Sequence, residues 1–405
     1  MEIRPILTTL RRHKTAALLI VLEIALACAI VCNALFLVMQ RVDNLRLPSG
    51  IAESELVQVR LSGIGKDANA DAISQEDLAA LRAIPGVTHA TIVNQVPFQG
   101  GSWNSSLTLT PDQENSTLNA AMYEASEDTL ATLGVRLVAG RDFLPDEYKL
   151  SSELENMEIA AMSGALIVSA EAAEKLFPDE PAVGKTVYMG GIPLHIVGVV
   201  ERLTRPTQMG GNRSHSMILP IRLNYNNGGF YLLRTDPARR DEVLKAAVAA
   251  LEKVAPNRLV MQQRSYEKIR ADYFSDDRDM IGLLLIVCGL LLLVTALGIV
   301  GLASFWVQQR TRQIGVRRAL GATKGQILAY FQTENFILAT AGIALGMLLA
   351  FGVNQLLMSR YELPRLPWLY LPIGALVLWA LGQIAVFGPA RRAASVPPAV
   401  ATRSV

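Results

Sequence analysis

The residues that could perform catalysis form no recognisable catalytic pattern. Gly63-Ile64-Gly65-Lys66 is the nearest approach to a nucleotide-binding loop, but it lacks the upstream glycine and the following Ser or Thr of G-x-x-x-x-G-K-[ST]. There is no G-x-S-x-G elbow, and the acidic residues between 276 and 279 lack the spacing of a calcium loop. The histidines show no metal-ligand spacing: His13, His89, His195 and His215. We therefore expect no catalytic residue, no metal site and no cofactor in this chain, and no ATP hydrolysis by it.

The segment Thr311–Leu328 (TRQIGVRRALGATKGQIL) carries the clearest chemistry for binding another molecule. It is basic, contains glycines and has no acidic residue. Arg317 and Arg318 can form charge-assisted hydrogen bonds with carboxylates or phosphates. Its apolar residues suit a groove, and its glycines permit close approach and a chain turn. This combination predicts a loop with a short helix that another protein grips. The alternative is that the charges only set membrane topology.

Four apolar runs flank and precede this segment. The chain has 405 residues, of which 51% are hydrophobic and 18% charged, and the runs are Thr15–Met39, Met280–Val307, Tyr330–Met358 and Pro367–Phe387. Because about 20 apolar residues cross a bilayer, each run predicts a spanning helix. The predicted fold class is an α-helical membrane protein with four transmembrane helices and a large α+β domain between helices one and two.

The charges are distributed unevenly along the chain. Residues 1–14, 308–329 and 389–405 together hold 12 basic residues and 1 acidic residue, whereas residues 41–279 hold 24 basic and 32 acidic residues. Basic residues gather on the cytoplasmic side of spanning helices, so we place both termini and the 308–329 loop inside and 41–279 outside. Topology and attraction to anionic lipid account for the basic segments, so we expect contact with membrane lipid and no nucleic-acid partner.

The outer region shows a weak two-fold repeat of β-α-β units. The first unit joins strands at 55–61 and 87–93 through a helix at 75–84, which Ser74 would cap with Asp77 three residues later. The second joins strands at 230–234 and 258–262 through a helix at 237–254, capped by Asp236. We assign the repeat to residues 51–99 and 214–264 and an inserted β-rich subdomain to 100–213.

A polar helical segment, Ser265–Met280, leads directly into the second apolar run without Pro or Gly. It predicts one continuous helix over 265–307, on the order of 60 Å long, that leaves the membrane as a stalk. The resulting division is an interfacial helix (1–14), which could equally be a basic tail, helix one (15–40), the outer domain (41–264), stalk and helix two (265–307), a cytoplasmic loop (308–329), helix three (330–358), helix four (367–388) and a cytoplasmic tail (389–405).

Three residues are assigned to packing inside the membrane. Glu23 lies within the first apolar run, where an unpartnered ionisable group costs a few kcal/mol. We expect it to hydrogen-bond another helix, within the subunit or across a dimer interface; the alternatives are snorkelling and protonation. Gly342-x-x-x-Gly346 permits close helix approach, either in the bundle or at a dimer seam.

Three stretches carry a resemblance to a known family. QRTRQIGVRRALGATKGQIL, ending at Leu328, resembles the cytoplasmic loop of FtsX-like, MacB-type ABC transporter permeases. Ala173–Val200 (AEKLFPDEPAVGKTVYMGGIPLHIVGVV) resembles the outer-domain signature of that family, and Pro389–Arg403 (PARRAASVPPAVATR) resembles its C-terminal tail. With the order of helices and outer domain, the resemblance covers essentially the whole chain.

The resemblance implies a permease subunit in a bacterial inner membrane. It implies a dimer with a second copy or a paralogue, and a separate pair of ABC ATPase subunits that bind ATP and Mg²⁺. A periplasmic adaptor and an outer-membrane duct often complete such assemblies. Three functions stay open: export of a drug, peptide, siderophore-like molecule or lipid from the periplasmic side, mechanical signalling to a periplasmic partner, and lipoprotein extraction. The residues assigned to ATPase coupling are Arg310, Thr311, Arg312, Ile314, Gly315, Val316, Arg317, Arg318, Ala319, Leu320, Gly321 and Ala322.

The loop departs from the family pattern at two positions. Gln309 and Gln313 stand where E-R-T-R-E-I-G carries acids, so the loop has a net charge of +5. Either the ATPase presents a more acidic groove than usual, or lipid phosphates neutralise the charge.

Overall fold

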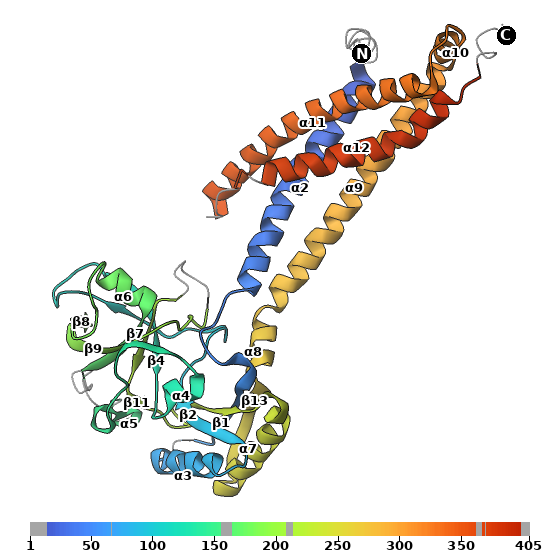
Figure 1. Ribbon diagram of the computed structural model, residues 1–405. Helices are drawn as coiled ribbons and strands as arrows, with labels where there is room; N and C mark the ends of the chain where they lie inside the picture. The colour runs from blue at the N-terminus through green and yellow to red at the C-terminus, as the bar shows by residue number, and fades with distance from the viewer. Residues whose placement is uncertain are drawn as a thin grey trace. The chain divides into compact units, whose positions relative to one another are not determined.

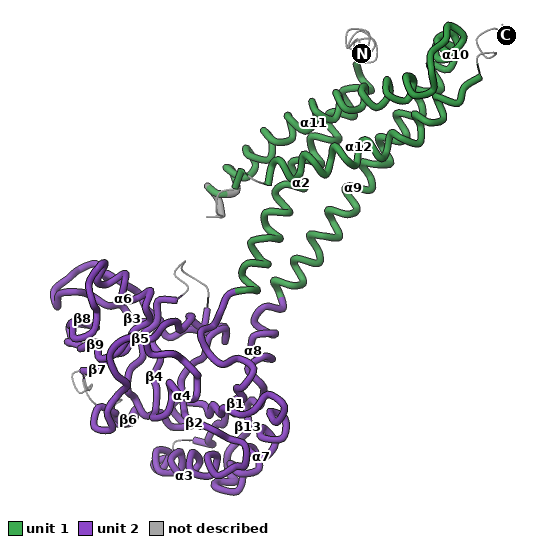
Figure 2. Tube along the Cα trace, in the orientation of Figure 1, with its two compact units in different colours: residues 1–46, 276–405 green, residues 47–275 purple. Residues whose placement is uncertain are grey.

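The computed structural model describes residues 14–65, 67–154, 164–207, 214–361, 367–368 and 370–397. The chain divides into two compact units (Figures 1 and 2). Residues 1–46 and 276–405 form one, which we call the helical unit, and residues 47–275 form the other, which we call the α+β unit. The predicted interfacial helix before Lys14 and the predicted tail beyond residue 397 lie outside the described residues.

The helical unit contains four helices that are long and apolar enough to cross a membrane, as the apolar runs predicted. They are α2 (Lys14–Leu45), α9 (Ser275–Gln309), α11 (Lys324–Tyr361) and α12 (Tyr370–Ala394). Each continues into polar residues, because helical backbone bonding does not end where the apolar run ends. Residues 324–329 of the predicted loop and 389–394 of the predicted tail are therefore helical.

Small residues let the helices of this unit approach closely. The buried side of α2 is rich in alanine and cysteine, and α2 packs against both α11 and α12. Chains with small side chains bring backbones together and gain dispersion contacts in lipid. At the end of α2 and the start of α9, Arg41 forms an ion pair with Asp277. One of the acidic residues between 276 and 279 is thus paired within the unit.

The β-α-β repeat of the α+β unit forms one antiparallel sheet. Its strand order is β13-β1-β12-β2, and its two repeats are related as in the split β-α-β arrangement. The elements are β1 (Leu56–Gly63), α3 (Ala70–Arg82), β2 (Val87–Val93), β12 (Phe230–Thr235), α7 (Arg240–Val254) and β13 (Arg258–Ser265). The helices α3 and α7 pack on each other and on one face of the sheet, around a core that includes Val59, Leu78 and Val243.

The inserted part builds a second, seven-stranded mixed sheet. Its path is β3-β4-β10-β7-β9-β5, and β8 pairs with β9. The strands are β3 (Asn104–Leu107), β4 (Leu118–Glu124), β5 (Leu137–Gly140), β7 (Ala165–Ser169), β8 (Thr186–Met189), β9 (Ile192–Val200) and β10 (Ser216–Leu219). The strands β6 (Lys149–Leu150) and β11 (Ile221–Arg222) form a separate short parallel pair. Three helices occur between the strands: α4 (Thr129–Leu133), α5 (Ser151–Leu154) and α6 (Ala170–Leu176).

The predicted boundary of the insertion at residue 213 is wrong. Strand β10 pairs with β4 and β7 of the seven-stranded sheet, and β11 pairs with β6. The insertion therefore continues to Arg222. Nothing local in Ser216–Leu219 distinguishes a strand of one sheet from a strand of the other, because only the partner strand decides membership.

The predicted continuous helix over 265–307 is also wrong. Strand β13 continues to Ser265, whose side chain caps α8 (Tyr266–Tyr273) by accepting from the Lys268 N–H. Phe274 then ends α8 with φ −97° and ψ 14°, and α9 begins at Ser275. Tyr266, Ile269 and Phe274 are buried in the α+β unit, so α8 is part of its core. Burial of these apolar side chains stabilises the break that local helix propensity did not reveal.

Candidate functional site

The predicted coupling segment forms a short helix, α10 (Thr311–Ala319), between α9 and α11. Gly321 follows it with φ +97°, a conformation that favours glycine, and this turn reverses the chain. Thr323 and Gln326 then begin α11 with a reciprocal capping arrangement, in which each side chain accepts the other residue's backbone N–H. The glycine and the cap together explain why the chain turns within a few residues between α10 and α11.

One face of α10 is buried against its own chain. Ile314 is only 4% exposed, and Gly315 is buried beside it. Ile314 belongs to a core cluster with residues from three other helices: Val307, Ile327, Phe331, Ala390, Ala393 and Ala394. Ile314 and Gly315 therefore pack inside the helical unit and are not exposed for direct contact, while their assignment to ATPase coupling stays a prediction.

Arg310, also assigned to ATPase contact, is buried as well. It is 6% exposed, and its Nη1 donates to both Glu334 carboxylate oxygens at 3.0 Å. Its guanidinium lies 5.5 Å from the ring centroid of Trp306. Arg310 stands at the turn between α9 and α10, and Glu334 stands on α11. The ion pair thus joins this corner to the next helix, and it supplies the acidic partner that the loop itself lacks.

The opposite face of α10 and the following turn are exposed. Leu320 is 83% exposed and Val316 is 43% exposed, so Leu320 is the more exposed of these two apolar residues of the predicted coupling set. The exposed members of the predicted set are Arg312, Val316, Arg317, Ala319, Leu320 and Gly321. Thr311 donates its hydroxyl to the Val307 carbonyl at 3.0 Å, and Arg318 donates to the Ala322 carbonyl at 3.1 Å. The exposed set could contact a partner; Thr311 holds the corner, and Arg318 and Ala322 hold the turn.

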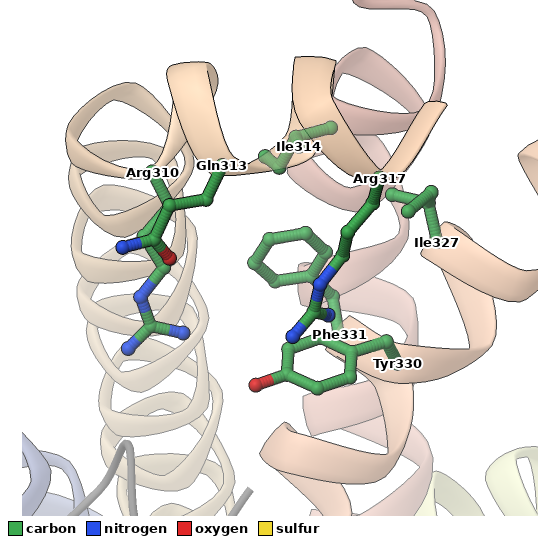
Figure 3. Close-up of a pocket in the computed structure, with 7 residues that line it drawn as sticks. All are labelled: Arg310, Gln313, Ile314, Arg317, Ile327, Tyr330 and Phe331. Carbon is green, nitrogen blue, oxygen red and sulfur yellow. The ribbon is translucent and has the colours of Figure 1, made fainter. Parts of the chain in front are cut away.

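A pocket lies between α10 and α11 (Figure 3). Figure 3 shows Arg310 and Gln313 on one side and Arg317 on the other, with Phe331 and Tyr330 between them. The Arg317 guanidinium lies 4.8 Å from the Tyr330 ring centroid. The pocket is lined by Arg310, Gln313, Ile314, Arg317, Ile327, Tyr330 and Phe331. It combines cationic walls with an apolar and aromatic floor.

Comparison with known families identifies both units. Residues 15–252 match the family model described as MacB-like periplasmic core domain, and residues 285–398 match FtsX-like permease C-terminal. The first match alone covers more than half of the chain. The chain belongs to the MacB/FtsX-like family of ABC transporter permeases. It is thus a membrane protein whose α+β unit is a MacB-like periplasmic core domain.

Individual relatives in this permease family are distant. The macrolide export ATP-binding/permease protein MacB of Chromobacterium violaceum is 26% identical over 296 residues, which are 70% of this chain and 43% of that protein. The uncharacterized ABC transporter permease YknZ of Bacillus subtilis is 27% identical over 241 residues, 58% of this chain and 61% of that protein. The chain therefore spans about half the length of these curated relatives.

Two solved structures of family members also resemble the chain. The extracellular domain of YknZ covers 51% of this chain and 100% of its own at 17% identity, with a TM-score of 0.33. The periplasmic region of MacB from Actinobacillus actinomycetemcomitans covers 57% of this chain and 97% of its own at 16% identity, with a TM-score of 0.34.

The predicted intramembrane residues of this permease all lie at helix contacts. A Cβ at Gly342 would come within 2.8 Å of the Ile24 Cβ, and one at Gly346 within 2.5 Å of the Cys28 Cβ. Both glycines therefore lie against α2 of the same subunit, which accounts for the motif without a dimer seam. The Glu23 carboxylate lies against Gly298 of α9, where any side chain would overlap it. Its predicted hydrogen bond to another helix remains a prediction.

Sequence reasoning missed a buried ionic network in the periplasmic core domain. Helix α3 begins at Ala70, so Ser74 and Asp77 are interior helix residues and not the predicted cap. Asp77 is completely buried and accepts from both Nη atoms of Arg258, with Nη2 at 2.8 Å, and from the Tyr231 hydroxyl. Burial raises the pKa of Tyr231 well above its usual range. Because aspartate is usually exposed, the sequence did not predict that Asp77 is buried. The one signal that could have suggested a partner is the position of Arg258 at the start of β13.

Tyr225 and Asp67 form a hydrogen-bonded pair next to Arg258 of the same network. The Tyr225 hydroxyl donates to the Asp67 carboxylate, and the Arg258 guanidinium lies 4.8 Å from the Tyr225 ring centroid. The pKa of Tyr225 is raised to about 12, mainly by burial and to a lesser extent by the hydrogen bond to Asp67. The hydroxyl of Tyr225 is therefore protonated at neutral pH, as its role as donor requires.

Proposed function

We propose that this chain is the permease subunit of an ATP-driven ABC transporter. In this proposal a separate ATPase subunit pair binds the exposed face of α10, and its ATP cycle changes the conformation of the periplasmic core domain. The family match supports the permease role, and the MacB relative from Chromobacterium violaceum is named as an ATP-binding/permease protein. The observation that carries the coupling site is a short basic helix with one buried and one exposed face, at a corner between two membrane-capable helices.

The charge distribution supports a cytoplasmic position for α10. Figure 1 shows the start of α2, α10 and the end of α12 at the same end of the helical unit. Lys14, Arg391 and Arg392 lie at those helix ends, and α10 carries three arginines of its own. Basic residues that share one end of a bundle are retained on the cytoplasmic side. Both termini would then be cytoplasmic in an inner-membrane protein.

The buried contacts of α10 suit mechanical coupling. A displacement of α10 would be transmitted to α9 through the turn at Arg310. It would reach α11 through the Arg310–Glu334 ion pair and α12 through the packing of Ile314. Rigid packing transmits displacement because close-packed interiors have low compressibility. The cargo in this proposal is a compound handled on the periplasmic side: a drug, peptide, siderophore-like molecule or lipid. The macrolide named for the MacB relatives belongs to the first of these classes.

The test is recovery of the ABC ATPase that copurifies with the wild-type chain from native membranes. Leu320→Asp and Arg312→Glu should each lower that recovery at least about tenfold, because one places a charge in an apolar contact and the other reverses the charge of an exposed residue. Lys324→Glu is the matched control, since it makes the same charge change on an exposed residue outside the assigned set. Unchanged recovery with both α10 variants, at normal membrane levels, would sink the coupling assignment.

A further inference from the structure

The pocket between α10 and α11 lies on one side of α10, and two of its lining residues, Gln313 and Arg317, are also exposed. Arg310, Gln313, Ile314 and Arg317 follow one another at helical spacings of three and four, so they share one side of the segment. Arg312 and Ala319 lie on the other side, whereas Val316 and Leu320 are three and seven positions after Gln313 and border the pocket side.

Arg310 has unused hydrogen-bonding capacity in this pocket. Only Nη1 binds Glu334, while Nη2 is buried and has no hydrogen-bond partner in the described part of the chain. A buried guanidinium N–H without an acceptor is costly, and an anionic oxygen is its strongest acceptor. Glu334 balances the charge of Arg310, and within the described ranges no carboxylate forms an ion pair with Arg317 on the opposite wall.

Gln313 makes the pocket more receptive to an anion. Its side chain lines the pocket beside Arg310 (Figure 3). A glutamate at this position would place a carboxylate between the two arginines. In this chain the position is neutral. An external anion can therefore take the place that an internal carboxylate would occupy.

The surroundings of the pocket resemble a membrane–water interface. Trp306 and Tyr330 lie next to its arginines, and aromatic rings of this kind are enriched at headgroup level. Ile327 and Phe331 provide an apolar floor at the start of α11. Basic pockets between membrane helices on the cytoplasmic side suit anionic lipid headgroups. A protein carboxylate would use the charges but would gain little from the apolar floor.

We propose that this pocket binds the phosphate group of an anionic phospholipid of the inner leaflet. Arg310 Nη2 and Arg317 would donate to the phosphate oxygens, and the glycerol and upper acyl region would lie against Ile327 and Phe331. The inference rests on the cytoplasmic placement of α10 in the proposed function. Bound lipid would brace α10 on α11 and so stiffen the element through which ATPase motion passes.

The test is native mass spectrometry of the full-length chain in detergent, titrated separately with dioleoyl-phosphatidylglycerol and dioleoyl-phosphatidylcholine. The wild-type chain should bind phosphatidylglycerol more tightly. Gln313→Glu should weaken that binding at least about tenfold, because it supplies a competing carboxylate inside the pocket. Gln309→Glu is the matched control: it adds the same charge at the exposed end of α9, outside the pocket, and should leave binding unchanged.

Equal binding of the two lipids, or equal losses in the two glutamate variants, would overturn the proposal, because net charge alone would explain the result. Inorganic phosphate that competes as well as the lipid at equal concentration would overturn it too, since the apolar floor would then be irrelevant. If Gln313→Glu lowers ATPase recovery and leaves lipid binding intact, the pocket serves a protein carboxylate and the lipid assignment fails. Failure of the coupling proposal is separate, because it shows as retained ATPase recovery in Leu320→Asp and Arg312→Glu.

Discussion

Two buried arginine–carboxylate pairs, one in each unit, differ in how completely they are bonded. In the periplasmic core domain, the Arg258 side chain is 4% exposed and Asp77 is 0% exposed. Arg258 binds both carboxylate oxygens and also donates to the carbonyls of Leu251 and Ala255. In the helical unit, Arg310 reaches Glu334 through one nitrogen, and its Nη2 has no partner in the described part of the chain.

The difference indicates different roles. A buried ionic network whose donors and acceptors are all used holds one arrangement, since any displacement leaves charges unpaired. The Arg258 network joins α3, α7, β12 and β13, and so holds the two halves of the β-α-β repeat together. The Arg310 pair keeps a free donor and joins only one corner to one helix. It can accept a further ligand or rearrange at lower cost, which suits an element that transmits motion.

The largest effect should follow from breaking the Arg258 network. Asp77→Asn leaves the guanidinium buried without its anion and should cost the core domain about 3–5 kcal/mol. Hydrogen exchange of β1 and β12 amides in the full-length chain should then accelerate more than about a hundredfold. The double variant Asp77→Leu with Arg258→Met removes both charges and should recover most of that loss. Slow exchange in Asp77→Asn would mean that the pair does not stabilise the domain.

A smaller effect should follow from trimming the same network. Tyr231→Phe removes one donor to Asp77 while both bonds from Arg258 remain, so we expect a loss of about 1.5–2 kcal/mol. The same exchange measurement on β1 and β12 should show an increase of about tenfold to thirtyfold. If Tyr231→Phe lowered the stability of the core domain as much as Asp77→Asn does, the Tyr231 hydroxyl and not the ion pair would be the main stabilising contact of Asp77.

The smallest effect should appear at the helical unit's pair. Arg310→Lys keeps the charge but loses the planar group that reaches Glu334 from the α9–α10 turn, so α10 should open more easily by about 1 kcal/mol. Exchange within Thr311–Ala319 should rise several-fold, while the core domain stays unchanged. Arg312→Lys is the matched control, because Arg312 is exposed. An equal response in the two variants would show that the ion pair does not position α10.

The parts that were predictable depend on local patterns. Apolar runs mark membrane helices because the bilayer demands a minimum apolar length, and the structure has four such helices. The β-α-β repeat was predictable because strand alternation repeats along the chain. Asp236 accepts from the Ala238 N–H and caps the 3₁₀ helix Pro237–Arg239, which precedes α7, so the predicted cap lies one short helix before Arg240. The position of α10 was readable from the basic, glycine-containing segment between two apolar runs.

The residues whose burial or local structure the sequence did not predict share a dependence on distant partners. Asp77 has the polarity of a surface or capping residue, and its burial depends on Arg258, 181 positions later. Arg310 has the character of a contact for another protein, and Glu334 removes it from that surface. Phe274 interrupts the expected stalk because its ring packs against Phe98, at a centroid distance of 5.0 Å. No local pattern encodes these choices.

By itself, the sequence determined the four apolar helices, the uneven charge, the β-α-β repeat and the basic corner segment, because composition and short-range periodicity set these directly. Only the tertiary structure decided which side of α10 is available and which arginines are already bonded. It also decided that α8 belongs to the core domain and that the GxxxG glycines lie against α2. Each of these depends on which distant side chain satisfies a buried charge or fills a contact, and that follows from packing the whole chain.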